Sequence, residues 1–244
     1  LPELDLAQAP GHLDGVTVHQ LLSHQTGLYD YTPWSEHPDD AELREIAEGR
    51  FAANEFAMLP AGIAWTYDNP DYSLAALLVE QLGGRRWPDV VIDDVARPLG
   101  MAHTYARRDD ALASETDIAS GYGPIQPTDY DDFEPLQHAT IELLPPDWTT
   151  PQEHADNAFL RPAGLVWSTA TDMARLGGFV IEGDRRVLSQ ASRAALVRAH
   201  VATLPGAEPE ELGYGYGLFV TRGFTGPDER TYDVPVLSHG GNTL

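Results

Sequence analysis

The chain has 244 residues, 42% of them hydrophobic and 22% charged, which is the composition of a folded globular protein rather than of a disordered one. Its 15 basic and 38 acidic residues give a formal net charge of −23, which argues against nucleic acid and polybasic membrane docking. The absence of cysteine excludes disulfides, thiol nucleophiles and cysteine-based zinc sites. No apolar run approaches the roughly 18 residues that span a membrane.

Two helices are predicted in the first fifty residues. Apolar residues spaced three and four apart predict a short helix that Thr17 caps and Gly27 ends. A polar helix is expected over residues 39–51, with its few apolar side chains on one face.

The clearest predicted helix begins after Asn69. Asn69 is suited to the N-cap, Pro70 to the first helical position, and the glycine pair at 83–84 to the end of the helix. A ladder of apolar residues spaced four apart is expected to form the buried face: Leu74, Leu78 and Leu82.

The later segments are predicted as a helix over 87–97, an irregular stretch over 121–158, helices opened by Thr169 or Thr171 and by Ser189, and strands over 214–220 and 234–238. Helices first and strands last predict an α/β protein of α+β type. We expect a mainly helical subdomain over residues 1–165 and the helices and first strands of a sheet domain over residues 166–244. The residues at both ends resemble the interior of a sequence rather than natural termini, so we expect the chain to be a piece of a longer protein.

Tyr67-Asp68-Asn69 is the first candidate for chemistry. A Tyr-x-Asn spacing places a phenol and a carboxamide on the same side of an extended segment. A phenolate serves as a general base once its pKa is lowered, and an amide can hold a substrate carbonyl. The alternative is structural: Asn69 only caps the helix and Tyr67 only packs.

His239-Gly240-Gly241-Asn242 is the second candidate, because it follows a predicted strand. The glycines would let a substrate approach the backbone, and the next N–H could donate to an oxyanion. The alternatives are a simple turn or the oxyanion loop of lipase-like α/β-hydrolases. The latter is disfavoured because the chain has no Gly-x-Ser-x-Gly and the motif comes late.

No metal site and no cofactor are predicted. His12, His19 and His24 are spaced seven and five residues apart, so no two of them share a helix face at metal-ligand spacing. They are interpreted as ordinary surface or core histidines.

Five segments, taken together and in order, resemble the serine β-lactamase and penicillin-binding-protein superfamily. They are closest to its class C-like branch, which includes D-Ala-D-Ala carboxypeptidases, D-aminopeptidases and esterases. The resemblance rests on Val16 to Leu28 with its Leu-Leu-Ser-His, Pro60 to Leu74 with its Tyr-x-Asn, Pro162 to Ala174, Tyr214 to Leu218, and Ser238 to Gly241. It covers nearly the whole chain and implies the β-lactamase/transpeptidase fold.

The resemblance implies acyl transfer through a serine ester. In that family the nucleophile lies in Ser-x-x-Lys, the lysine helps to deprotonate the serine, and the tyrosine of Tyr-x-Asn assists the proton transfers. By the same match, Tyr67 and His239 are the catalytic candidates. The substrate-binding candidates are Asn69, Gly240, Gly241 and Asn242, with the Asn242 backbone N–H as one oxyanion donor. Histidine at 239, where β-lactamases usually have lysine, favours peptidase or esterase chemistry.

One departure from the family is decisive. All 15 basic residues are arginine, so the chain cannot contain Ser-x-x-Lys. The resemblance places that motif before Leu1 and the final strands after Leu244. We therefore expect that the 244-residue chain alone does not form an acyl-enzyme.

Several alternatives stay open at this level. One is a catalytically inactive homologue that binds peptidoglycan-like peptides or a protein partner. Another is an unrelated acidic helical domain. The expected partner is a small-molecule or peptide substrate, and the sequence leaves the oligomeric state open. No signal peptide is visible, whereas the resemblance favours export, so the compartment is also left open.

Overall fold

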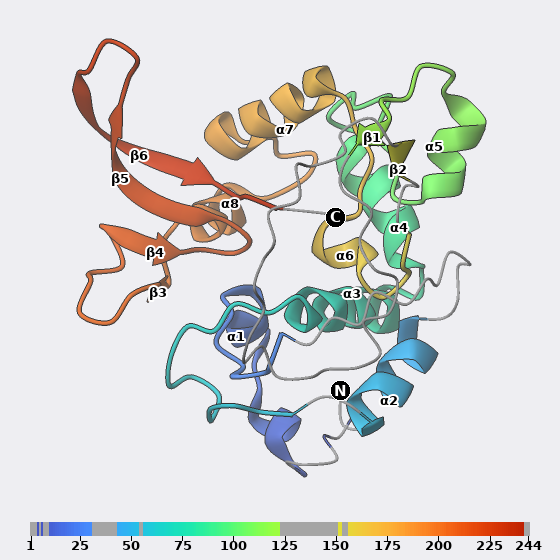
Figure 1. The fold of residues 1–244 in the computed structure, drawn as a ribbon, viewed down its shortest axis with the longest axis vertical. Coiled ribbons are helices and arrows are strands. Elements are labelled where there is room, and N and C mark those ends of the chain that lie inside the picture. The colour runs from blue at the N-terminus through green and yellow to red at the C-terminus, as the bar shows by residue number, and fades with distance from the viewer. Residues whose placement is uncertain are drawn as a thin grey trace.

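The computed structural model describes Leu4, Leu6 and residues 10–30, 43–53, 56–122, 151–152 and 156–241. The helical elements are η1 (His12–Gly15), α1 (Val18–Leu22), α2 (Leu43–Ala53), α3 (Pro70–Gly83), α4 (Trp87–Val90), the π-helix η2 (Val91–Ala96), α5 (Arg108–Ser114), α6 (Arg161–Gly164), α7 (Ala170–Glu182) and α8 (Gln190–Leu196). The strands are β1 (Gly121–Tyr122), β2 (Pro151–Gln152), β3 (Val201–Ala202), β4 (Leu212–Tyr214), β5 (Phe219–Thr225) and β6 (Thr231–Ser238). Helices lead and the longer strands follow, which confirms the predicted α+β architecture (Figure 1).

The main sheet is antiparallel, with the strand order β3-β4-β5-β6. β5 and β6 form its longest pair, and Phe219 at the start of β5 lies opposite Ser238 at the end of β6. This register places His239 just past the sheet, where the helical region approaches it (Figure 1). The predicted strand over 234–238 is confirmed as the second part of β6.

The predicted strand over 214–220 is wrong. Tyr214 ends β4 and Phe219 begins β5, so the segment is a hairpin rather than one strand. The chain reverses through Gly217, whose φ of +80° is a conformation that glycine adopts without steric cost. A Cβ on Gly217 would also lie 3.1 Å from the hydroxyl of Tyr72. The alternation of apolar residues did not reveal this reversal.

α1 begins where the sequence predicts but ends earlier. The Thr17 hydroxyl accepts the backbone N–H of Gln20 at 3.3 Å, and the Gln20 side chain accepts the Thr17 N–H at 2.9 Å, which is a reciprocal cap. The helix ends at Leu22, five residues before the predicted end. Gly27 instead turns the following loop, with φ +75°, against the carbonyl of Leu59.

α3 has the predicted length, but a different residue caps it. Asn69 itself has helical φ and ψ angles, and its side chain does not cap the helix. The neighbouring Asp68 does so: its Oδ1 accepts the backbone N–H of Asp71 at 2.8 Å. Pro70 occupies the first turn and Gly84 ends the helix in the left-handed conformation, both as predicted.

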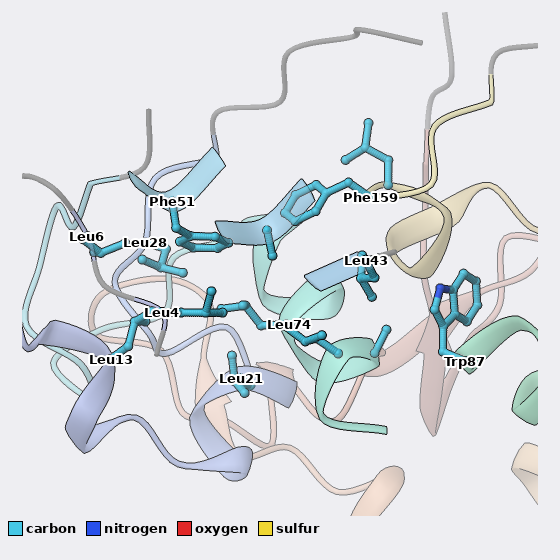
Figure 2. Packing of buried hydrophobic residues seen from close by; sticks show 14 of the residues in the cluster. Leu4, Leu6, Leu13, Leu21, Leu28, Leu43, Phe51, Leu74, Trp87 and Phe159 are labelled. Carbon is cyan, nitrogen blue, oxygen red and sulfur yellow. The ribbon is translucent and has the colours of Figure 1, made fainter. Parts of the chain in front are cut away.

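The buried face of α3 also differs from the prediction. Leu74 and Leu77 are buried, whereas Leu82, the last member of the predicted ladder, is 84% exposed. The helix carries apolar residues on more than one face, so spacing alone does not select the one that packs. Leu74 lies at the centre of the core in Figure 2. The core cluster consists of Leu4, Leu6, Leu13, Leu21, Leu28, Leu43, Ala47, Phe51, Leu74, Ala76, Leu77, Trp87, Ala106, Phe159 and Leu160.

The other predicted helices are present. The segment 87–97 forms α4 and η2, and 39–51 corresponds to α2. Thr169 and Ser189 cap α7 and α8 with their side chains, although α8 ends at Leu196, before His200. Most of the expected irregular stretch 121–158 lies outside the described residues. No helix among the described residues is long and apolar enough to cross a bilayer.

Candidate active site

A pocket of about 220 Å³ lies where the helical region meets the sheet. Its walls come from the loop after α1, the Tyr-x-Asn segment, α3, α6, the β4–β5 turn and the end of β6. The lining residues are His24, Tyr67, Asp68, Asn69, Tyr72, Pro162, Ala163, Tyr214, Gly217 and His239. The structure therefore brings together three residues that the sequence singled out: Tyr67, Asn69 and His239.

Tyr67 and His239 face each other across this pocket. Their ring centroids are 6.0 Å apart, although the two residues lie far apart in the sequence. His239 Nε2 lies 3.2 Å from the hydroxyl of Tyr214, which holds the imidazole at the end of β4. A phenol and an imidazole at this separation can share one small substrate group, and both can donate or accept a proton.

Gly240 and Gly241 continue the chain past β6. They do not line the pocket, and a Cβ added to either would meet no atom within 4 Å among the described residues. Their proposed role in substrate binding stays a prediction. Asn242, the expected oxyanion donor, lies outside the described residues.

The surroundings of Tyr67 favour the neutral phenol. Burial raises its pKa above the usual value of 10.0, and the nearby carboxylates of Asp30 and Asp68 raise it further. Burial likewise raises the pKa of Tyr72 and Tyr214, the two other phenols at the pocket. The sequence interpretation needed a lowered pKa for a tyrosine base, and the described residues do not supply it.

His24 lies beneath the pocket and is 1% exposed. Its ring centroid is 4.5 Å from that of Tyr67 and 4.9 Å from that of Tyr214. Burial, and secondarily the proximity of His239, lowers its pKa to about 3, so its ring is neutral near pH 7. The sequence interpretation treated it as an ordinary histidine. Its place in the Leu-Leu-Ser-His segment was the signal that could have linked it to the site.

His24, Asp68 and Asp71 form a buried cluster whose ligand atoms all lie within 4.8 Å of one another. Asp71 Oδ2 lies 3.4 Å from His24 Nδ1. That nitrogen already accepts the Asp68 backbone N–H at 3.4 Å, and Asp68 Oδ1 accepts that of Asp71. Burial and the charge of Asp68 raise the pKa of Asp71, so this carboxyl group takes up a proton more readily than a free one. The spacing would suit a metal ion, and the predicted absence of one stays a prediction.

Asp30 holds the Asn69 side chain from outside the pocket. Its Oδ1 accepts the backbone N–H of Asn69 at 2.9 Å and the Asn69 amide nitrogen at 3.1 Å. The sequence interpretation missed Asp30, because nothing in its local pattern predicts a contact 39 residues along the chain.

These features define a class of protein. A helical region joined to an antiparallel sheet, with Tyr-x-Asn and His-Gly-Gly segments meeting between them, is the arrangement of the β-lactamase/transpeptidase fold. The Beta-lactamase family model matches residues 1–243, and the chain belongs to this family of serine hydrolases.

Known proteins agree with that assignment. The chain is 31% identical over 126 residues to the unguisins hydrolase of Aspergillus violaceofuscus, covering 50% of this chain and 22% of that protein. It is 26% identical over 218 residues to a penicillin-binding protein of Bacillus subtilis, covering 84% and 43%. The fold matches a D-stereospecific amidohydrolase of Streptomyces with a TM-score of 0.67 and 20% identity, over 99% of this chain and 64% of that one. The chain thus spans less than half the length of these two curated relatives.

Proposed function

We propose that this chain forms the proton-transfer and substrate-binding side of a serine acyl hydrolase active site, acting on an amide, peptide or ester. The observation that carries the proposal is the pocket itself, which Tyr67 and His239 both line although they lie far apart in the sequence. The D-stereospecific amidohydrolase among the structural neighbours supports the amide reading.

The reaction would proceed in two steps, acylation of the serine and hydrolysis of the acyl-enzyme. The serine Oγ forms a bond to the substrate carbonyl carbon, the bond between that carbon and the leaving nitrogen or oxygen breaks, and the serine proton passes to the leaving amine or alcohol. Water then attacks the acyl-serine ester, which releases the acid and restores the serine hydroxyl. Tyr67 would relay the proton to the leaving group, for which a neutral phenol is the correct state. It would act as a base only beside a cation, such as the family's Ser-x-x-Lys lysine.

His239 would orient the substrate from the opposite wall, held there by Tyr214. A histidine offers a directional hydrogen bond rather than a permanent positive charge, so it binds a substrate carboxylate less firmly than a lysine would. This supports amide, peptide or ester hydrolysis over hydrolysis of carboxylate-bearing β-lactams.

Covalent labelling tests this proposal. The natural protein that carries this chain and the isolated 244 residues are each treated with a fluorophosphonate and a penicillin, and adducts are located by mass spectrometry. We expect an adduct on the natural protein at a serine of a Ser-x-x-Lys motif. We expect none on the isolated chain, which has no lysine. A natural protein that lacks the motif and forms no adduct would instead favour the inactive homologue that binds peptides or a protein partner.

A further inference from the structure

Three buried side chains beneath the pocket direct metal-binding atoms at one another. They are His24 on the loop after α1, Asp68 just before α3 and Asp71 in the first turn of α3. Nδ1 of His24 lies 3.4 Å from Asp71 Oδ2 and 4.0 Å from Asp68 Oδ2. Tetrahedral zinc with bonds of about 2.0–2.1 Å holds its ligand atoms roughly 3.3 Å apart. The Asp71 distance fits this geometry directly, and the Asp68 carboxylate would move inward.

Hydrogen bonds leave the facing lone pairs poorly used. Neither oxygen of Asp71 has a hydrogen-bond partner among the described residues, although the side chain is 0% exposed. Nδ1 of His24 accepts the Asp68 backbone N–H at 3.4 Å, which is longer than an ordinary hydrogen bond. Asp68 Oδ2, the oxygen nearer His24, accepts the Thr26 hydroxyl at 3.5 Å. Buried polar groups without partners cost stability, so an occupant that binds all three side chains would stabilise the cluster.

The charges around the cluster favour a cation as this occupant. Besides the carboxyl groups of Asp68 and Asp71, the nearby charge of Asp30 raises the pKa of Asp71. His24 is neutral near pH 7, because burial and secondarily His239 lower its pKa to about 3, so its lone pair is available to a metal. His239 itself carries at most one positive charge. The phenols that touch the His24 ring are neutral, because burial raises their pKa values. Acidic groups therefore outnumber cationic ones here even when His239 is protonated.

The lysine of the family's Ser-x-x-Lys does not replace this cation. A segment outside the chain can contact only atoms that the chain leaves accessible, and the Asp71 side chain is fully buried and does not line the pocket. A lysine beside Tyr67 would therefore act on the cluster only from a distance. The competing occupant is a proton shared between Asp71 and Asp68. It would neutralise one carboxylate without improving the long hydrogen bond at His24 Nδ1.

We propose that His24, Asp68 and Asp71 form a binding site for a divalent transition-metal ion such as Zn²⁺. One imidazole nitrogen with two carboxylates suits Zn²⁺, whereas Mg²⁺ and Ca²⁺ favour oxygen ligands alone. His24 and Asp68 line the pocket, which gives the ion a path of entry. The ion would fasten the loop after α1 to the start of α3, directly beside Tyr67. This site does not depend on the proposed hydrolase function.

Zinc binding to the natural protein that carries this chain tests the site. The protein is freed of metal with a chelator, and its affinity for Zn²⁺ is measured by calorimetry at pH 7. The variants are Asp71→Asn, His24→Gln and the control His19→Gln, which alters an exposed histidine outside the cluster. The unfolding temperature of each protein is measured with and without Zn²⁺.

We expect wild type to bind one Zn²⁺ per chain and to unfold at a higher temperature with it, since an ion that binds the folded state stabilises that state. Asp71→Asn and His24→Gln should each weaken binding by at least about 100-fold, because losing even an outer-shell partner costs about 10- to 100-fold. His19→Gln should bind like wild type. Asp71→Asn keeps the shape of the side chain and removes a buried charge, so it tests the site even if His24→Gln does not fold.

The contrary outcomes are distinct. No zinc binding by wild type overturns the metal site and leaves the shared proton as the occupant. Binding that survives Asp71→Asn, or that His19→Gln weakens as much, also overturns the site, because the ion then lies on surface histidines. Zinc bound at the cluster without hydrolysis of any amide or ester leaves the metal site standing and defeats the proposed hydrolase.

Discussion

The hydroxyl of Tyr214 lies 3.2 Å from Nε2 of His239 and so ties the end of β4 to the residue that follows β6. Both side chains line the pocket, and Phe219 packs against both rings, with centroids 5.0 Å from Tyr214 and 5.7 Å from His239. The sheet therefore does more than support the site: its hairpin register decides where His239 points.

Removing that hydroxyl should loosen His239 without unfolding the sheet. Tyr214→Phe keeps the ring and removes the hydroxyl that contacts His239 and the Tyr72 side chain. A hydrogen bond is worth about 0.5–1.5 kcal/mol, so we expect kcat/KM to fall by up to about tenfold. Tyr216→Phe is the matched control, since that hydroxyl bonds His19 rather than His239. Steady-state kinetics on the natural protein measure both variants. Equal losses of kcat/KM in the two variants would show that the position of His239 does not depend on the Tyr214 hydroxyl.

Replacing Asp71 by asparagine should change how stability depends on pH. Burial, and next the charge of Asp68, raises the pKa of Asp71 in the folded protein above the unfolded value of 3.8. Its contribution is fully present below that unfolded pKa and is lost as pH rises through the folded pKa. The amide that replaces the carboxyl group does not titrate, so in the absence of metal we expect Asp71→Asn to gain stability relative to wild type as the pH rises above the unfolded pKa of 3.8. Urea unfolding of both proteins at several pH values tests this. A difference in the free energy of unfolding that does not change with pH would contradict the prediction.

Gly27 should tolerate no side chain. Its φ is +75°, and an added Cβ would lie 2.1 Å from the carbonyl oxygen of Leu59. Gly84 has a similar φ of +62° but no atom near its Cβ position among the described residues. Gly84→Ala should therefore lower the free energy of unfolding only by the backbone strain of about 1–2 kcal/mol. Gly27→Ala should lower it clearly more, because the added Cβ also clashes. Thermal unfolding ranks the two, and equal losses would contradict the predicted clash.

A buried ion pair at the start of α6 should contribute to the stability of the fold. Arg161 Nε and Nη2 donate to Asp156 at 2.6 and 2.7 Å, and each side chain is 2% exposed. Asp156→Ala would leave the guanidinium buried without its partner carboxylate, so we expect a loss of about 3–5 kcal/mol in the free energy of unfolding. The double variant Asp156→Leu with Arg161→Met should recover much of the stability that Asp156→Ala loses. A single variant as stable as wild type would refute this reading.

The sequence predicted the elements better than their contacts. The proximity of Tyr67 and His239 was predicted because each lies in a short motif and the motifs occur in the order of a known family. The sequence did not predict the places of Asp30 and His24, since their contacts are with residues about 40 positions away. Local patterns also assigned the cap of α3 to the wrong residue. Asp68 and Asn69 are equally good capping residues, and only the structure shows that Asp68 accepts a backbone N–H of the first turn.

Hydrolysis by a Tyr67→Phe variant of the natural protein tests the central claim most directly. Phenylalanine at this position keeps the ring beside His24 and removes only the hydroxyl that would carry the proton. For the amide, peptide or ester substrates of the proposed function, we expect kcat to fall by about 10²- to 10⁴-fold, as for the loss of a general acid or base. Tyr29→Phe, whose ring stacks on Phe56, should leave kcat unchanged. A Tyr67→Phe enzyme with wild-type kcat would show that this pocket is not where the acyl group is transferred.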